Sequence, residues 1–406
     1  MAGVSEGCAI TYFQSLSAAG FAATAISYGP GRMGFGLFVP EISATFSMSS
    51  TMVGLVSSLG FLGFFIALMI AQALLSRQGP GVPVLSGLGA ATAGMGIVAL
   101  APNVPVLAVG VFLAASSAGF AWTPFNDAVH RKIRDVDRPA AFSEISTGTS
   151  VGIALAGLSA LVVALTGLSW RWCWAFFSLA AAAAFVANRM SLRSVEKASD
   201  AVPEVRWRDL FQGAAAPLFA IGFVYGATSA IYISFAANHI RESGGVPGVS
   251  AAATPALVFI CFGLFGLVGL LTGRLKGRFG LAWLVRLVML SGAGSVILVA
   301  ALPDSWAGLI GSAGLQGMHV MVTSAILAFW SERLFPHLPA LSFTAALLAS
   351  AAGSVLGPAA AGAAIDAFGA QAMFFGAAVL PVALLIVLRD RHVRDAPVPM
   401  GAAGSF

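Results

Sequence analysis

The chain has 406 residues, of which 58% are hydrophobic and 9% are charged. Soluble globular proteins carry about 25% charged residues, so this composition excludes a water-soluble enzyme of similar size. Intrinsic disorder is excluded as well, because apolar runs rich in Leu, Val, Ile and Phe recur along the whole chain. The composition indicates an integral membrane protein with several spans.

Long apolar runs follow one another along the chain. A helix needs roughly 20 apolar residues to cross a bilayer. On this basis we expect twelve transmembrane helices, over 14–39, 51–75, 82–101, 104–130, 140–166 and 170–190, and over 213–239, 253–273, 281–301, 305–333, 340–366 and 370–389. The fold class predicted is an all-α polytopic membrane protein.

The longest polar interval divides these helices into two groups of six. We expect an N-terminal six-helix bundle over 1–190, a cytoplasmic linker over 191–212, and a C-terminal six-helix bundle with a short cytoplasmic tail over 213–406.

The basic residues predict the orientation in the membrane. Seventeen of the 21 Lys and Arg fall in loops on one side, whereas Arg171 and Arg241 fall on the other, and Arg32 and Arg286 lie within helices. Lys and Arg collect in cytoplasmic loops, so both termini are expected in the cytoplasm of a multi-pass protein of the bacterial inner (plasma) membrane. The same rule accounts for the net charge of +5 without a nucleic-acid partner.

An internal repeat supports two related halves. At an offset of 201 residues, Leu74-Leu-Ser-Arg77-Gln-Gly79 aligns with Leu275-Lys-Gly-Arg278-Phe-Gly280. The same offset places Phe142-Ser143 on Phe343-Thr344, and Gly152 on Gly353. Repeats of this kind are typical of secondary transporters.

These residues resemble the major facilitator superfamily of secondary transporters, whose loop signature is roughly G-x-L-x-D-R-x-G-R/K-R/K. The first copy keeps Leu74, Arg77 and Gly79, and the second keeps Gly273, Leu275, Arg278 and Gly280. Ser76 and Gly277 stand at the acidic position, so the usual charge pair of the cytoplasmic gate is missing from both copies.

The resemblance extends beyond this loop. Trp170-Arg171-Trp172 and Trp330-Ser-Glu-Arg333-Leu-Phe-Pro336 also look like the superfamily, and the run 31–40 is similar to helix 1 of its YbfB/YjiJ-type branch. The resemblance implies two pseudo-symmetric bundles, a central site between them, and rocker-switch alternating access. It assigns gating roles to Leu74, Arg77, Gly79, Gly273, Arg278, Gly280 and Arg333.

Arg32 is the leading candidate for substrate binding. A charged residue at the centre of a membrane helix costs about 2.5–3.5 kcal/mol on insertion scales and is therefore a functional hypothesis. The flanking Gly29-Pro30-Gly31 predicts an interruption of the helix, and Tyr28 lies one turn earlier. Guanidinium binds carboxylates bidentately, and one deep cation favours a monoanion. The alternative is that Arg32 extends to the surface or pairs with a helix neighbour for packing. Arg286 lies near the start of the ninth helix, and we expect it to extend to the cytoplasmic surface.

Three further helices carry polar or aromatic residues at helical spacing. Gln316, His319 and Thr323 share a face of the tenth helix, where His319 could contact substrate, belong to a proton path, or be a packing histidine. The other candidates for the pocket wall are Tyr225, Ser229 and Tyr232 on the seventh helix, and Trp122 and Asn126 on the fourth. The aromatic residues could equally belong to the core or face lipid.

An acid–base cluster is expected at the cytoplasmic ends of the fourth and fifth helices. Asp127 and Arg131 are four residues apart in the order that favours helix pairing. We expect Glu144 to join them with a cytoplasmic arginine, and the cluster to close the inner gate when the halves meet.

These observations predict a transporter that is not an enzyme. We expect symport of a small organic monoanion of carboxylate type, carried out by a monomer. We expect no cofactor or metal, because Cys8, Cys173 and Cys261 lie far apart in the sequence and form no cluster. Coupling to protons is left open, since acids such as Glu41 and Asp366 lie at helix ends. One alternative is an efflux permease for amphipathic drugs or metabolites; another is a membrane enzyme or sensor, for which catalytic clusters and a soluble domain are missing.

Overall fold

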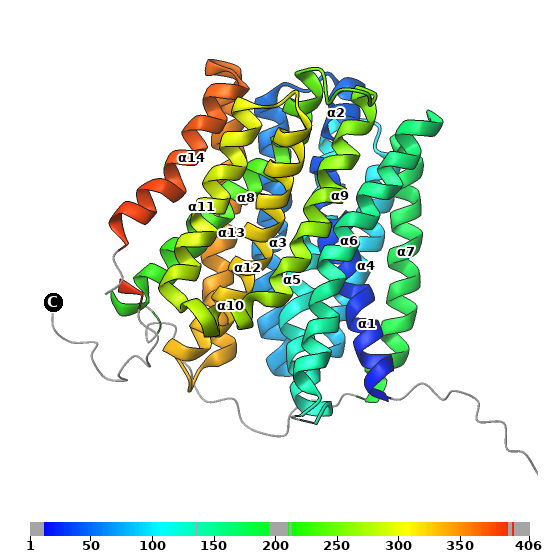
Figure 1. The fold of residues 1–406 in the computed structure, drawn as a ribbon. Helices are drawn as coiled ribbons and strands as arrows, with labels where there is room; N and C mark the ends of the chain where they lie inside the picture. Colours follow the sequence, from blue (N-terminus) through cyan, green and yellow to red (C-terminus); the bar gives the residue numbers. More distant parts are fainter. Residues whose placement is uncertain (1–11, 135, 195–209, 211–212, 389–391, 394–406) are drawn as a thin grey trace, which may run out of the picture.

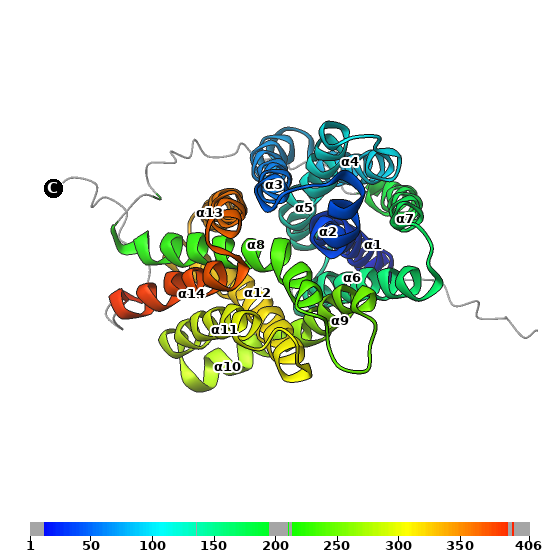
Figure 2. The ribbon, with the colours of Figure 1, turned by 90° about the horizontal axis from the view of Figure 1, so that it is seen from above.

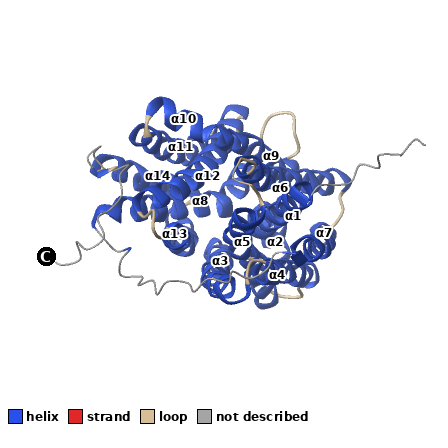
Figure 3. Cartoon of the chain, turned by 90° about the horizontal axis from the view of Figure 1, so that it is seen from below, coloured by secondary structure: helices blue, strands red, loops and turns tan. Residues whose placement is uncertain are grey.

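The computed structural model describes residues 12–134, 136–194, 210, 213–388 and 392–393, and these residues form helices and connecting loops without strands (Figure 3). The longer helices in chain order are α1 (Tyr12–Ile26), η1 (Ser27–Gly31), α2 (Arg32–Phe46), α3 (Ser50–Gln78), α4 (Gly81–Leu100), α5 (Val104–Lys132), α6 (Arg138–Thr166), α7 (Trp170–Ser191), α8 (Ala216–Glu242), α9 (Thr254–Gly266), η6 (Leu267–Leu271), α10 (Thr272–Phe279), α11 (Leu281–Ala301), α12 (Trp306–Leu334), α13 (Pro339–Phe368) and α14 (Ala370–Val387). Three short 3₁₀ turns are η2 (Leu192–Ser194), η4 (Gly213–Ala215) and η5 (Ala251–Ala253).

The described helices confirm the predicted membrane protein. Eleven segments are long and apolar enough to cross a bilayer. A twelfth span is formed by α1, η1 and α2, which run on continuously as two α-helices joined by a π turn. The first span ends at Phe46 rather than near 39, because Pro40 lies within α2 and the chain turns only at Ser47, where φ is +52°.

The helices gather into two groups that lie side by side in the view along their axes (Figure 2). We call α1 to α7 the N-terminal half and α8 to α14 the C-terminal half. Most of the predicted linker, residues 195–209 and 211–212, lies outside the described residues.

The local geometry of the two halves repeats at the expected offset. Gly79 and Gly280 both end a helix with φ near +80°, at +78° and +83°, a conformation that glycine adopts readily. Gly152 lies against the backbone of Ala25 in the first span, and Gly353 lies against that of Phe223 in α8, the first span of its own half. The repeat is therefore visible in backbone conformation as well as in sequence.

One ion pair and two hydrogen bonds join the halves at the end of the molecule that is uppermost in Figure 1. There Glu41 of α2 pairs with Arg241 of α8 at 2.5 Å. Asp366 of α13 accepts hydrogen bonds from the backbone N–H groups of Ser50 and Thr51 at the start of α3, at 3.2 and 2.9 Å. We call this the Glu41 end, and the opposite end, which carries the α5–α6 connection, the Arg131 end.

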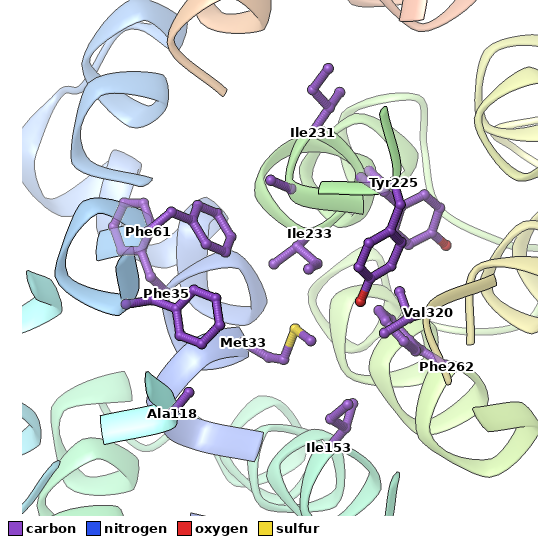
Figure 4. Packing of buried hydrophobic residues seen from close by; sticks show 14 of the residues in the cluster. Met33, Phe35, Phe61, Ala118, Ile153, Tyr225, Ile231, Ile233, Phe262 and Val320 are labelled. Carbon is purple, nitrogen blue, oxygen red and sulfur yellow. The ribbon is translucent and has the colours of Figure 1, made fainter. Parts of the chain in front are cut away.

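Buried apolar side chains from both halves form one continuous core. Figure 4 shows Met33 and Phe61 of the N-terminal half together with Ile233 and Val320 of the C-terminal half. On the Glu41 side, beneath the ion pair, Gly36 of α2 lies directly against the backbone of Ile233 in α8, so the two halves are in contact there.

Candidate functional site: a central cavity with one arginine

A cavity of about 310 Å³ lies between the two halves. The N-terminal half contributes η1, α2, α3, α5 and α6, and the C-terminal half contributes α8, α9, η6, α12 and α13. Its aromatic and charged lining residues are Tyr28, Arg32, Phe64, Trp122, Phe142, Tyr225 and Phe343. The volume is at the lower end of the range for small-molecule sites, roughly 300–1,000 Å³.

The cavity extends toward the Arg131 end. Ser143 in the second turn of α6 is exposed and lines it, and so do Ala328, near the end of α12, and Phe343, near the start of α13. At the same end α3 and α13 stay connected, because Thr344 donates a hydrogen bond to Gln72 at 3.4 Å. The cavity is therefore closed at the Glu41 end and continues toward the Arg131 end.

Arg32 is held by aromatic rings rather than by acids. Its guanidinium carbon lies 4.5 Å from the ring centroid of Phe64, 5.6 Å from that of Phe61 and 5.8 Å from that of Tyr28. Ring faces attract a cation without neutralising it. The buried Arg32 Nε has no hydrogen-bond partner, and no described carboxylate lies within ion-pairing distance of the guanidinium.

The helix around Arg32 is widened, not broken. The sequence predicts an interruption at Gly29-Pro30-Gly31, but these residues form the π turn η1, and the N–H of Arg32 donates to the carbonyl of Gly29. Gly29 also packs directly on the backbone of Gly152 in α6, a closeness that a side chain at either position would prevent. Backbone donors freed by a broken helix are therefore not part of this site, and the arginine side chain supplies the positive charge.

A row of hydroxyl groups lines the cavity on α6. Ser143, Ser146, Thr147 and Ser150 follow the i, i+3, i+4, i+7 spacing of one helix face. Ser146 and Thr147 donate to carbonyls of their own helix, those of Phe142 at 2.6 Å and Ser143 at 2.8 Å. Their oxygen lone pairs stay available as acceptors for a bound molecule.

The C-terminal half contributes a paired phenol and hydroxyl. Tyr225 of α8 lies 3.1 Å from the hydroxyl of Ser324 of α12, oxygen to oxygen, and both residues line the cavity. The Tyr225 ring also meets the imidazole of His319 edge to face, with 5.4 Å between the centroids. Tyr225 is therefore fixed from behind and presents its polar tip to the cavity.

Four of the predicted pocket residues line this cavity: Tyr28, Arg32, Trp122 and Tyr225. Asn126 is half-buried one turn beyond Trp122 and is not among the lining residues. Ser229 donates to the carbonyl of Tyr225 within α8, so its hydroxyl serves its own helix.

The remaining predicted pocket residues lie inside the C-terminal half. Tyr232 is fully buried, with its hydroxyl 3.2 Å from that of Ser312. His319 has its Nδ1 2.7 Å from the carbonyl oxygen of Val288 and its Nε2 3.5 Å from the hydroxyl of Thr228. His319, Gln316 and Thr323 share a face of α12 that is turned toward α8 and α11, whereas the cavity is lined by the neighbouring face of α12. This geometry favours the interpretation of His319 as a packing residue.

Asp127 and Arg131 form the predicted ion pair, with bonds of 2.5 and 2.9 Å. Both residues belong to α5, so the pair does not cross between the halves. Glu144 is exposed and has no ion-pair partner among the described residues. The wider network expected around Glu144 is therefore not formed in this conformation.

The residues of the loop signature occupy two matching positions. Arg77 and Arg278 are exposed near the ends of α3 and α10, and Gly79 and Gly280 follow them at the turns. Leu74 packs beside Phe120 of α5 in a small cluster. Gly273 is the second residue of α10 and is exposed, and Arg333 lies exposed near the end of α12.

Sequence reasoning missed two features of the site. Phe61 and Phe64 are three residues apart on α3, the spacing that places both rings beside one guanidinium. The hydroxyl row of α6 has the same kind of signal, a polar face in an otherwise apolar helix. Within the described residues, no group of three His, Cys, Asp or Glu side chains could hold a metal ion.

Comparisons with known proteins agree with this architecture. The family model of the Major Facilitator Superfamily matches residues 20–282, more than half of the chain. No curated protein sequence matches significantly.

Several solved structures share the fold. The nucleoside transporter NupG is 14% identical over 93% of this chain and 98% of its own, with a TM-score of 0.70. A POT family transporter in complex with 5-aminolevulinic acid is 13% identical over 92% and 94%, with a TM-score of 0.74. A bacterial homologue of the human lysosomal transporter Spinster, inward-facing and unoccupied, is 16% identical over 95% and 96%, with a TM-score of 0.69. The family match and the two-half fold around a central cavity together show that this chain belongs to the Major Facilitator Superfamily and is a transporter rather than an enzyme.

Proposed function

We propose that this chain is a secondary transporter of a small organic monoanion, bound in the central cavity by Arg32. The observation that carries the proposal is the guanidinium itself, which lines the cavity, is surrounded by aromatic rings and lacks a described acidic partner. Because a buried charge is stable only when it is paired or solvated, the site is complementary to an anion.

The cavity chemistry supports one negative charge on an organic body. Arg32 is the single charged residue among the described residues that line the cavity, so a dianion would leave one of its charges unpaired. A carboxylate suits the planar fork of a guanidinium. The rings of Phe64, Trp122 and Phe343 offer apolar contacts, and the α6 hydroxyls offer hydrogen bonds to the far end of the solute.

The arrangement of the halves supports alternating access. The halves meet at the Glu41 end through the Glu41–Arg241 pair and the contact of Gly36 with the Ile233 backbone, whereas the cavity continues toward the Arg131 end. The excess of Lys and Arg in the loops of the Arg131 end supports its assignment to the cytoplasm of a bacterial inner membrane. Under that assignment the structure corresponds to an inward-facing state.

A second candidate function is efflux of amphipathic compounds. It is favoured by the apolar part of the lining, which includes Phe142, Met321 and Leu347. The two proposals differ in their dependence on Arg32: an amphipathic neutral or cationic compound gains nothing from a guanidinium, whereas an anion requires it.

The test measures exchange of monocarboxylates in proteoliposomes. The purified protein is reconstituted into liposomes loaded with an unlabelled monocarboxylate, and entry of the same labelled compound is followed for lactate, pyruvate, mandelate and gluconate. Exchange with an identical internal pool detects a carrier whatever its coupling. Saturable entry of at least one compound is expected.

The variants separate the charge from the fold. Arg32→Ala is expected to abolish entry, and Arg32→Lys to retain a part of it, because lysine keeps the charge but loses the bidentate fork. Arg286→Gln, which removes an exposed arginine of α11 away from the cavity, is the matched control and is expected to behave as wild type. Entry that survives in Arg32→Ala, or saturable exchange of neutral amphipathic compounds alone, would overturn the anion proposal.

A further inference from the structure

The charge of the cavity is not balanced by any group in its described lining. Arg32 is cationic, and the other lining residues are neutral. The titratable groups that face it are the phenols of Tyr28 and Tyr225. His319 lies behind Tyr225, and its Nδ1 forms a hydrogen bond with the carbonyl oxygen of Val288. The described lining therefore holds no carboxylate that could neutralise Arg32 or carry a proton with the solute.

The described acids are also too far along their helices to enter the cavity. Every Asp and Glu that the structure describes lies in a loop or within two turns of a helix end. Glu41 is paired with Arg241 at the closed end, Asp127 is paired with Arg131 on its own helix, and Glu144 is exposed. A rocking motion of rigid halves changes which end is open, but it does not move these residues to the level of Arg32.

Arg32 must remain charged when the cavity closes at both ends. A guanidinium does not lose its proton in a protein. In the structure its open side faces the cavity, where water can reach it, while Phe61 and Phe64 cover other sides. When the Arg131 end closes as well, water is removed and the empty site would contain an unpaired cation, which is strongly unfavourable. A bound carboxylate pairs with the guanidinium and removes this obstacle.

We infer that the transporter is an obligate exchanger of organic anions, in which the cavity changes its access only when Arg32 holds an anion. This inference rests on the proposed function and specifies how the same site is coupled. The anion acts on the conformational equilibrium through its stronger interaction with the occluded state than with the open one. One monoanion then moves inward for each one that moves outward, with no net charge and no proton transferred.

Three sets of liposomes test the coupling. The first is loaded with the unlabelled transported monocarboxylate, the second holds only buffer, and the third holds buffer with an inward proton gradient. Entry of the labelled compound is expected to be at least about tenfold faster in the first set than in the other two. Equal rates in the first two sets would overturn the inference in favour of a uniporter, and accumulation driven by the proton gradient would overturn it in favour of symport. If no set shows entry, the proposed function itself fails, which is a different result.

A measurement on the empty protein tests the role of Arg32 directly. Ser234 of α8 is 2% exposed and lines a small void next to Arg32 on the side of the Glu41 end. In a variant without the three native cysteines, Ser234→Cys should react slowly with a membrane-impermeant maleimide and faster when the transported monocarboxylate is added. Adding Arg32→Gln is expected to raise labelling without any anion by about tenfold, because the neutral site can close empty. The Arg286→Gln variant should stay slow. An Arg32→Gln protein that still needs the anion would contradict the inference.

Discussion

Gly36 of α2 provides the most direct test of how the two halves close. It packs against the backbone of Ile233 in α8, where the halves meet below the Glu41–Arg241 pair. A methyl group at Gly36 would lie 2.9 Å from the carbonyl carbon of Ile233 and 3.1 Å from its Cγ2, and nearer still to the carbonyl oxygen. Non-bonded heavy atoms in contact are about 3.5–4.0 Å apart, so Gly36→Ala forces the helices apart by about 1 Å or more.

The cost falls on the state that is closed at the Glu41 end. Overpacking of a tight contact costs about 1–3 kcal/mol, which corresponds to a shift of roughly 5- to 150-fold in a two-state equilibrium. The strain is released when α2 and α8 separate, because each helix keeps its own packing within its half. We therefore expect Gly36→Ala to favour opening at the Glu41 end and to slow transport.

The assay is again maleimide labelling of Ser234→Cys in the absence of the native cysteines. Labelling is expected to accelerate in Gly36→Ala. Gly34→Ala is the matched control on the same helix, since its methyl would press on Trp174, at 2.9 Å from the ring, inside the N-terminal half. Gly34→Ala is expected to lower thermal stability without accelerating labelling. Unchanged labelling in Gly36→Ala, or equal acceleration in both variants, would refute the reasoning.

Three smaller perturbations address the ion pair, the repeat and the buried histidine. Glu41→Gln is expected to weaken closure by less than about 1 kcal/mol, because Glu41 and Arg241 are partly solvated, with 27% and 29% of their side chains exposed; the charge-reversed pair Glu41→Arg with Arg241→Glu should restore the wild-type labelling rate of Ser234→Cys. Gly79→Ala and Gly280→Ala are each expected to destabilise the detergent-solubilised protein by about 1–3 kcal/mol, because both glycines have positive φ; thermal unfolding should show similar shifts, and a shift in only one would argue against equivalent turns. His319→Ala is expected to lower stability by about 2–4 kcal/mol while the preference among monocarboxylates is kept; competition between them measures this, and an altered order of preference would place His319 in the binding site.

The architecture could be predicted from the sequence because it follows from hydropathy and charge alone. A lipid bilayer accepts few structures other than apolar helices, so twelve long apolar runs predict twelve spans. The offset of 201 residues also has a physical basis, since Gly79 and Gly280 need the same positive φ in their turns. Helix ends were less predictable. The helix α2 continues through Pro40 to Phe46, because in a transmembrane helix the backbone groups that a proline leaves without a partner can be satisfied by neighbouring groups.

The site was predictable only where a residue was unusual for its surroundings. Arg32 is costly within a membrane, and that cost by itself points to a functional role. Phe61 and Phe64 carry no such signal, because phenylalanine is common in membrane helices. The same holds for Ser143, Ser146 and Thr147, because serine and threonine hydroxyls can bond to their own helix and are therefore tolerated anywhere along it.

The α12 residues show why helical periodicity cannot choose between a cavity and a bundle interior. Gln316, His319 and Thr323 share one face, as their spacing requires. The next residue after Thr323, Ser324, is rotated by about 100° and lies on the face that lines the cavity together with Met321. That face is mainly apolar, whereas the polar face is turned inward against α8 and α11. Polarity thus predicted the existence of the polar face but not the direction in which it points.

The repeat gives the two halves similar helices but different chemistry at the centre. At the offset of 201 residues, the counterpart of Arg32 is Ile233, and the counterpart of Tyr28 is Ser229. Ile233 is buried against Gly36 at the closed contact between the halves, while Arg32 faces the cavity. Among the described lining residues, therefore, the charge presented to the solute comes from the N-terminal half alone. In a rocking motion an anion paired with Arg32 would move with that half, and the C-terminal half, with Tyr225 and the apolar face of α12, would close over it. The asymmetry lets one arginine determine both what is bound and when the halves can close.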